Sequence, residues 1–242
     1  MNRPTIFAHR GASGKCFENS MKSFLEAYKQ KADGLEIDVQ LTEDGVPMVI
    51  HDSNIFRLAG IKKEISSMTY AEVKKIRIGR KYIRGLFGHH IPTLHEVANF
   101  CSTHKMGLNI ELKETVLERP DSVAQIIAIT SGVDRIHISS FHYPLIAKVK
   151  EISPNMETAF LVRKKGVDWE NLNEYRSADG FHLHKRLLTE PYVSKIVSTG
   201  KKIRVYGVTG KENFISNPPT YIDGWITDYP GVLLKRKKDF DE

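Results

Sequence analysis

Short apolar runs rich in β-branched residues alternate along the chain with longer segments in which apolar residues recur at helical spacing. This alternation is typical of parallel strands joined by crossover helices. We predict nine strands, at 6–8, 35–39, 48–50, 108–112, 136–139, 159–162, 181–183, 203–206 and 224–227. Because 242 residues suit one (β/α)8 barrel, we predict an α/β protein with a single domain over 1–242, built as a TIM barrel from eight of these strands.

The surplus strand is explained by Asp44-Gly45, which lies between the second and third runs. That dipeptide favours a two-residue type I′ turn, so the third run should pair antiparallel with the second at the mouth of the barrel. With the turn at these two residues, the ladder places His51 directly opposite Asp38. The return strand should therefore carry a histidine to the mouth.

The segment after this hairpin, about 52–92, is too long for an ordinary connection. It contains the basic run 80–85, and we predict an insertion over the mouth that could act as a lid. Helix starts are indicated by possible capping boxes at Thr69 with Glu72 and at Thr93 with Glu96, and by Thr189 before a Glu-Pro pair.

Composition limits the class of protein but does not indicate a function. A 40% hydrophobic and 27% charged chain is typical of a soluble globular protein. The start of the chain shows no secretion signal, and no apolar stretch is long enough to span a bilayer, so we expect a cytoplasmic protein without membrane insertion. The net charge of +7 is scattered and lacks a recognised motif, so nucleic acid binding is not expected. Cys16 and Cys101 should be free thiols, and no pattern specifies an oligomeric state.

Three carboxylates should converge at the C-terminal ends of the strands, where active sites of such barrels lie. Glu36 and Asp38 are two residues apart in one strand, so both face the same side, and Glu111 enters from the next barrel strand. Uncompensated, they would repel one another and raise each other's pKa. A divalent cation, Mg²⁺ or Ca²⁺, would resolve this because all the ligands are oxygens. The alternative is an ion-pair network with Arg10 and Lys113.

Two histidines are predicted at the same mouth. His9 ends the first strand and His51 comes from the return strand; taken singly, each would more often be structural. Together beside a cation they suit acid–base chemistry, in which one removes a proton from a nucleophile and the other protonates a leaving alkoxide. Arg10 and Lys113 add positive charge that suits a phosphate. Phe141 follows a strand and could wall a pocket or belong to the core.

The other histidines carry weaker signals. His182 and His184 share one face of a strand and could form a second metal pair, but no third ligand is evident. Surface positions are predicted for His89, His90, His95 and His104.

Taken in order, several motifs resemble those of the glycerophosphodiester phosphodiesterase family, and the resemblance covers nearly the whole chain. Each tripeptide alone is weak, whereas the ordered set is specific. The motifs are His9-Arg10-Gly11, Glu18-Asn19-Ser20, 36–42 with Asp44-Gly45, His51-Asp52, 91–94, 109–113, Ser139-Ser140-Phe141 and 226–230.

This resemblance implies a TIM-barrel hydrolase that splits small glycerophosphodiesters into sn-glycerol 3-phosphate and an alcohol. It implies that His9 and His51 are the general base and acid, and that the substrate's own glycerol 2-hydroxyl attacks phosphorus, which gains from proximity. It also implies that Glu36, Asp38 and Glu111 hold the metal, whereas Arg10 and Lys113 hold phosphate.

Three departures from the family pattern bear on substrate preference more than on activity. They are Lys15-Cys16-Phe17, Lys31-Ala32-Asp33, and the run 205–208, where Tyr206 replaces a tryptophan in the wall beside the glycerol or the leaving alcohol. Two alternatives stay open: a lysophospholipase D-like enzyme, which would need an apolar channel, and a phosphate-ligand binding barrel without turnover.

Overall fold

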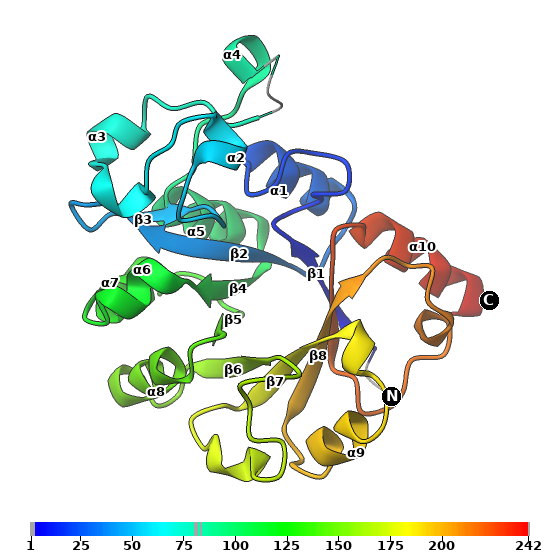
Figure 1. The fold of residues 1–242 in the computed structure, drawn as a ribbon. Helices are drawn as coiled ribbons and strands as arrows, with labels where there is room; N and C mark the ends of the chain where they lie inside the picture. The colour runs from blue at the N-terminus through cyan, green and yellow to red at the C-terminus, as the bar shows by residue number, and fades with distance from the viewer. Residues whose placement is uncertain (1–2, 80–81, 83, 242) are drawn as a thin grey trace.

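The computed structural model describes residues 3–79, 82 and 84–241, and within them nine strands form one sheet. Eight parallel strands close into a barrel through the pairing of β1 with β2, and β3 pairs antiparallel with β2 outside the ring (Figure 1). The predicted α/β fold, a TIM barrel with an extra hairpin strand, is confirmed. The strands are β1 (Thr5–His9), β2 (Gly34–Leu41), β3 (Pro47–Val49), β4 (Gly107–Leu112), β5 (Ile136–Ser140), β6 (Glu157–Val162), β7 (Gly180–His184), β8 (Lys202–Val208) and β9 (Gly224–Thr227).

Helices cover the outside of the barrel, as parallel strands that are buried on both faces require. All eight residues of β2 are buried. The main helices around the barrel are α1 (Met21–Lys29), α5 (Leu94–His104), α6 (Glu114–Glu118), α7 (Ser122–Ile129), α8 (Tyr143–Ile152), α9 (Tyr192–Val197) and α10 (Pro230–Asp241). Short 3₁₀ helices η2 (Leu172–Glu174), η3 (Lys185–Leu187) and η4 (Asn213–Ile215) occur in the connections on the β6–β9 side.

The hairpin register differs by one residue from the prediction. Val39 lies opposite Val49, and the Ile50 N–H donates to the Asp38 carbonyl at 3.0 Å, so the prediction that His51 lies opposite Asp38 was wrong. A type I′ turn needs positive φ at both central residues, but only Gly45 has one, with φ of 80°. The turn therefore contains three residues, 43–45, closed by the Thr42 N–H donating to the Val46 carbonyl.

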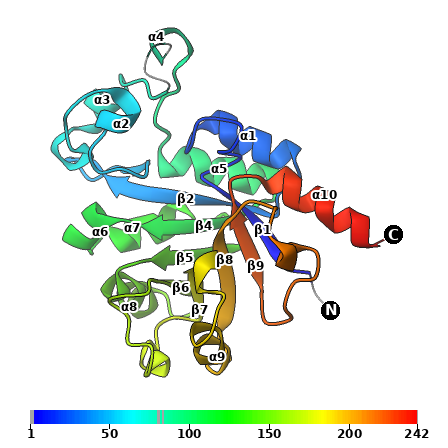
Figure 2. The same cartoon turned by 45° about the vertical axis from the view of Figure 1, so that its right-hand side comes forward.

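The insertion after β3 forms a small layer with its own apolar cluster beside the barrel (Figure 2). It contains α2 (Phe56–Ala59), η1 (Ile65–Ser67), α3 (Tyr70–Val73) and α4 (Arg84–Phe87). The capping box of Thr69 with Glu72 is formed, as is the box of Thr93 with Glu96 that starts α5. Of the basic run, residues 80, 81 and 83 lie outside the described residues, and a lid function stays a prediction.

Several smaller predictions can be compared with the structure. In the described ranges, no helix combines the length and apolar character needed to cross a membrane. Cys16 and Cys101 are free thiols. Of the four histidines predicted at the surface, His95 is exposed, whereas the others are half-buried, and His104 packs against the Tyr28 ring.

Candidate active site

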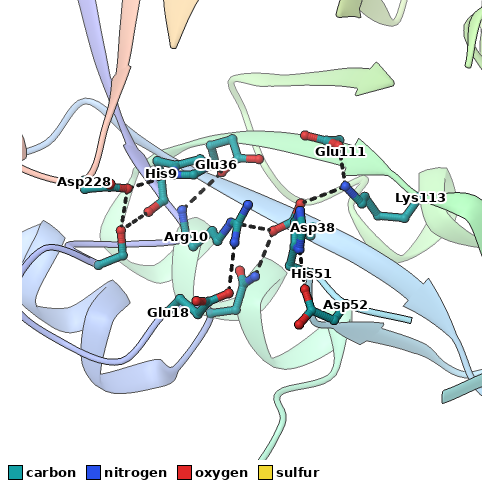
Figure 3. Close-up of polar contacts among 12 residues, drawn as sticks. His9, Arg10, Glu18, Glu36, Asp38, His51, Asp52, Glu111, Lys113 and Asp228 are labelled. Carbon is teal, nitrogen blue, oxygen red and sulfur yellow. Dashed lines mark hydrogen bonds and ion pairs between the residues drawn. The ribbon is translucent and has the colours of Figure 1, made fainter. Parts of the chain in front are cut away.

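Three carboxylates converge inside the barrel mouth, on neighbouring strands (Figure 3). Glu36 and Asp38 project from β2, and the register places Glu111 of β4 directly beside Asp38. One carboxylate oxygen from each of the three residues lies within 4.8 Å of the other two. The residues are only 2%, 0% and 7% exposed, respectively. The strand period and the parallel register therefore build a compact, buried group that could hold a metal ion.

The pKa values of the three groups show how their charges compete. Burial raises the pKa of Glu36 to about 8, and the charge of Asp38 adds to this rise. Burial and Asp38 also raise the pKa of Glu111. Burial acts in the same direction on Asp38, but the cations of Arg10 and Lys113 outweigh it and lower the Asp38 pKa. One carboxylate is thus ionised, and its two neighbours resist ionisation because burial and the charge of Asp38 oppose it.

Two cations partly compensate the cluster. The Arg10 Nε lies 3.1 Å from Asp38 Oδ2, and Lys113 Nζ lies 2.8 Å from Glu111 Oε1 and 3.7 Å from Asp38 Oδ1. Arg10 is shared, because its Nη1 also pairs with Glu18 at 2.9 Å. The ion-pair network proposed as an alternative therefore exists for Asp38 and Glu111.

Glu36 lies outside that network. Its Oε2 accepts the backbone N–H of Arg10 at 3.1 Å and lies 4.0 Å from His9 Nε2, and no lysine or arginine side chain of the described residues pairs with it. Asp38 Oδ1 is buried and has no hydrogen-bond partner in the described part of the chain. Buried, unpaired oxygen atoms are costly unless a cation or donor meets them. The donor set of Glu36, Asp38 and Glu111 therefore fits a hard divalent cation.

His9 is fixed by a carboxylate from the neighbouring last strand. Its Nδ1 lies 2.7 Å from Asp228 Oδ1, which also accepts the Ser13 hydroxyl at 2.7 Å. Burial opposes ionisation of Asp228, but the bond to His9 is among the causes that lower its pKa, so the carboxylate accepts and Nδ1 carries the proton. Burial would lower the pKa of His9, but Glu36 and the Asp228 bond outweigh it and raise that pKa.

His51 is held in the same way on the other side of the cluster. Its Nδ1 lies 2.6 Å from Asp52 Oδ1, and Arg57 of the insertion pairs with Asp52 through Nε at 2.6 Å. Burial alone would raise the pKa of Asp52, but Arg57 and His51 outweigh it and lower that pKa, so Nδ1 is again the donor. Each histidine thus has Nε2 left for proton transfer, an arrangement in which the carboxylate orients the ring.

Four residues that complete this site carried no assigned role in the sequence interpretation: Asp228, Asp52, Asn19 and Arg57. Asp228 directly follows β9, the strand that pairs with β1, so its proximity to His9 could have been found from barrel closure. Asn19, which donates to Asp38 Oδ2 at 2.9 Å, lay within a family motif. Nothing in the sequence pattern indicated Arg57, because it reaches the site from the insertion.

Phe141 and Tyr206 lie on a different part of the mouth. Their rings meet edge-on at 6.4 Å between centroids, and the His184 ring lies 5.3 Å from Tyr206. His182 is buried deeper, against the ring of His137. Among the residues that the structure describes, neither His182 nor His184 belongs to a group of three possible metal ligands, so nothing supports the second metal pair.

A cleft of about 590 Å³ opens beside His9 and Arg10. The insertion contributes Gly79, Phe87 and His89 to its wall, and Lys22 comes from α1. The insertion therefore borders the mouth next to His9, the last residue of β1, and Arg10, which follows it.

Residues 9–232 match the model of the glycerophosphoryl diester phosphodiesterase family. The chain belongs to this family. A family relative named glycerophosphodiester phosphodiesterase from Caldanaerobacter subterraneus is 30% identical over 232 residues, which cover 95% of this chain and 96% of the relative. A protein of the same name from Bacillus altitudinis is 30% identical over 240 residues, covering 97% of this chain and 98% of the relative.

A solved structure supports the same family assignment. An Oleispira antarctica phosphodiesterase in complex with the product sn-glycerol-3-phosphate is 27% identical, with a TM-score of 0.87 and 97% of each chain covered. The resemblance predicted from the motifs is confirmed at the level of the family and the fold.

Proposed function

We propose that the protein is a glycerophosphodiester phosphodiesterase that hydrolyses small glycerophosphodiesters to sn-glycerol 3-phosphate and an alcohol, and that it requires a divalent cation. The observation that carries this proposal is the pair of carboxylate-fixed histidines around a buried three-carboxylate cluster in which Glu36 has no lysine or arginine partner among the described residues. Residues 1–242 form one catalytic domain in this proposal, with 52–92 as an insertion.

The cation would be Mg²⁺ or Ca²⁺, held by Glu36, Asp38 and Glu111, the ligand oxygens that hard cations prefer. When bound, it supplies positive charge that stabilises the phosphate through the transition state. Arg10 and Lys113 border the same carboxylates, so we assign them to the phosphate oxygens. In this position the two side chains can contact the carboxylates and a bound phosphate at the same time.

The histidines move the protons. His9 accepts a proton at Nε2 from the glycerol 2-hydroxyl as that oxygen attacks phosphorus. His51 donates a proton from Nε2 to the alkoxide when its bond to phosphorus breaks, so the alcohol leaves neutral. Water then opens the cyclic phosphate with the roles reversed. Asp228 and Asp52 hold the rings in the required tautomer throughout.

The decisive experiment follows release of sn-glycerol 3-phosphate from glycerophosphoglycerol, glycerophosphoethanolamine and glycerophosphocholine, with Mg²⁺, with Ca²⁺ and with EDTA. We expect metal-dependent release and production of the free alcohol in equal amount. Absence of release from every diester, in folded protein loaded with metal, would contradict the proposal. Cleavage of lysophospholipids alone would support the lysophospholipase D alternative, and binding without cleavage would support the ligand-binding barrel. The cytoplasmic location and the lack of nucleic acid binding stay predictions.

A further inference from the structure

The half of the mouth opposite the carboxylates is formed by the ends of β5 to β8. His184 of β7 lies directly beside Tyr206 of β8. The β6–β7 register ends with Val162 beside Leu183, and one further residue along it places Arg163 next to His184. Arg163, His184 and Tyr206 therefore follow one another along the rim, and Phe141 completes the row from β5.

Arg163 is held over an aromatic face in this row. The carbon of its guanidinium lies 3.9 Å from the centroid of the Phe141 ring, a close cation–π contact. Phe141 in turn meets Tyr206 edge-on. Residues from both halves of the mouth affect the pKa of Tyr206. Burial raises this pKa, Arg163 lowers it and Glu111 raises it. Both Arg163 and Glu111 are therefore close enough to Tyr206 to affect its ionisation.

The residues that directly follow β6, β7 and β8 are mainly basic, whereas acidic residues such as Asp168, Glu170 and Glu190 come later in the same loops. The segments 163–167, 185–189 and 209–212 carry one acidic residue, Glu212, which pairs with Lys185 and also accepts the Thr209 hydroxyl. No carboxylate of the described residues lies within ion-pair distance of Arg163, whose side chain is exposed. The six cations of these segments are Arg163, Lys164, Lys165, Lys185, Arg186 and Lys211.

We propose that Arg163, seated on Phe141, forms an anion subsite for the alcohol half of the diester, so that the preferred leaving alcohol carries a phosphate or carboxylate. This inference rests on the proposed function, which places the phosphodiester at the carboxylates, and it adds that the far end of the alcohol extends from there toward β5–β8. A cationic alcohol such as choline is disfavoured twice: the Phe141 face is already covered by a guanidinium, and the surrounding rim repels positive charge.

Matched diesters test the subsite. Glycerophosphoglycerol and its terminally phosphorylated form differ by one phosphate, glycerophospholactate supplies a carboxylate, and glycerophosphocholine supplies a cation. For the native metal-loaded enzyme we expect kcat/KM for the phosphorylated diester to exceed that for glycerophosphocholine by about tenfold, the scale of one charge-assisted contact at an exposed site. Cleavage of glycerophospholactate distinguishes the two kinds of site: a general anion site should also favour this carboxylate diester, whereas a phosphate site should not.

The variant Arg163→Gln should lower the ratio of kcat/KM, phosphorylated over choline diester, by about fivefold to tenfold. Arg176→Gln is the control, because it removes an arginine from the connection before β7, at the opposite end of the barrel. Added salt should lower the ratio of kcat/KM, phosphorylated over choline diester, in the native enzyme, because salt screens an exposed charge. The same ratio should stay nearly constant in Arg163→Gln.

The same diesters should also be titrated into metal-loaded His51→Ala protein, where binding is measured without turnover. If this protein binds the phosphorylated diester more strongly than the choline diester, and the difference disappears when Arg163→Gln is added, the subsite is supported. This result would stand even if the native protein cleaved none of the diesters and the proposed function failed. A native preference for the choline diester, or equal ratios in Arg163→Gln and Arg176→Gln, would overturn the inference while leaving the phosphodiesterase activity in place.

Discussion

The two halves of the barrel mouth differ in burial, charge and chemistry. On the β1–β4 side, Glu36, Asp38 and Glu111 are buried in strands, and each histidine is fixed by a carboxylate. On the β5–β8 side, Phe141 and Tyr206 are half-buried, and the residues that directly follow β6 and β7 are mainly basic. The three carboxylates lie on paired strands, whose geometry is fixed, whereas Phe141 and Arg163 on the alcohol side follow the ends of their strands. The comparison indicates that one half carries the reaction and the other selects the substrate.

The largest effect should come from removing a proton carrier on the β1–β4 side. His51→Ala is expected to lower kcat by about 10³-fold, within the range of general acid–base catalysis, with circular dichroism and thermal unfolding like those of the native protein. His95→Ala, an exposed histidine of α5, is the control and should keep full activity. A fully active His51→Ala protein would remove His51 from the reaction.

A ligand of the cluster comes next. Glu111→Gln should weaken Mg²⁺ or Ca²⁺ affinity by about 100-fold, because even outer partners of a metal site are worth tenfold to 100-fold. Glu118→Gln in α6, an exposed position, should bind the metal like the native protein in a calorimetric titration. Unchanged affinity in Glu111→Gln would exclude Glu111 as a ligand.

The pH dependence of metal binding tests whether the cation binds Glu36, the carboxylate of the cluster without a lysine or arginine partner in the described residues. The folded pKa of Glu36 is about 8 and its ordinary value is 4.5, so in metal-free protein the folded state holds a proton that the unfolded chain has released between these values. This group's contribution to stability therefore falls as pH rises across that window. A cation requires the ionised form, so affinity should increase by at least about tenfold from pH 6 to pH 8. Calorimetry at both pH values would contradict this if the affinities were equal.

The smallest effect should come from the β5–β8 side. Tyr206→Trp is expected to change kcat/KM by about threefold, in opposite directions for different alcohols, since it reshapes only an aromatic wall. Metal affinity in the same variant serves as the internal reference and should not change. A large loss of metal affinity would show that the two halves of the mouth are not separable.

Much of this architecture could be predicted from the sequence, because it depends on the two-residue period of strands and on the order of the strands along the chain. The spacing of Glu36 and Asp38 fixes their common face, and the succession of strands brings Glu111 beside them. The hairpin register could not be predicted, because whether Asp44 also adopts positive φ depends on the bond that it accepts from the Thr42 hydroxyl. His51 still reaches the site because it follows the strand, outside the ladder.

Contacts from distant segments were the least predictable. Arg57 belongs to the insertion, and its reach to Asp52 and Glu18 depends on how that layer packs on the barrel. The position of Arg163 over Phe141 likewise depends on side-chain packing at the ends of two strands, for which the hydrophobic pattern carries no signal. Period and motif thus indicate which residues reach the mouth, whereas the tertiary packing decides which of them touch.

The most direct test is a metal titration of chelator-treated protein while release of sn-glycerol 3-phosphate from glycerophosphoglycerol is followed. We predict no release without metal, restoration by Mg²⁺ or Ca²⁺ that saturates as the three-carboxylate site fills, and no restoration at the same concentrations in Glu111→Gln. Full release in the chelated protein, or equal restoration in that variant, would contradict the assignment of the reaction to a cation held by Glu36, Asp38 and Glu111.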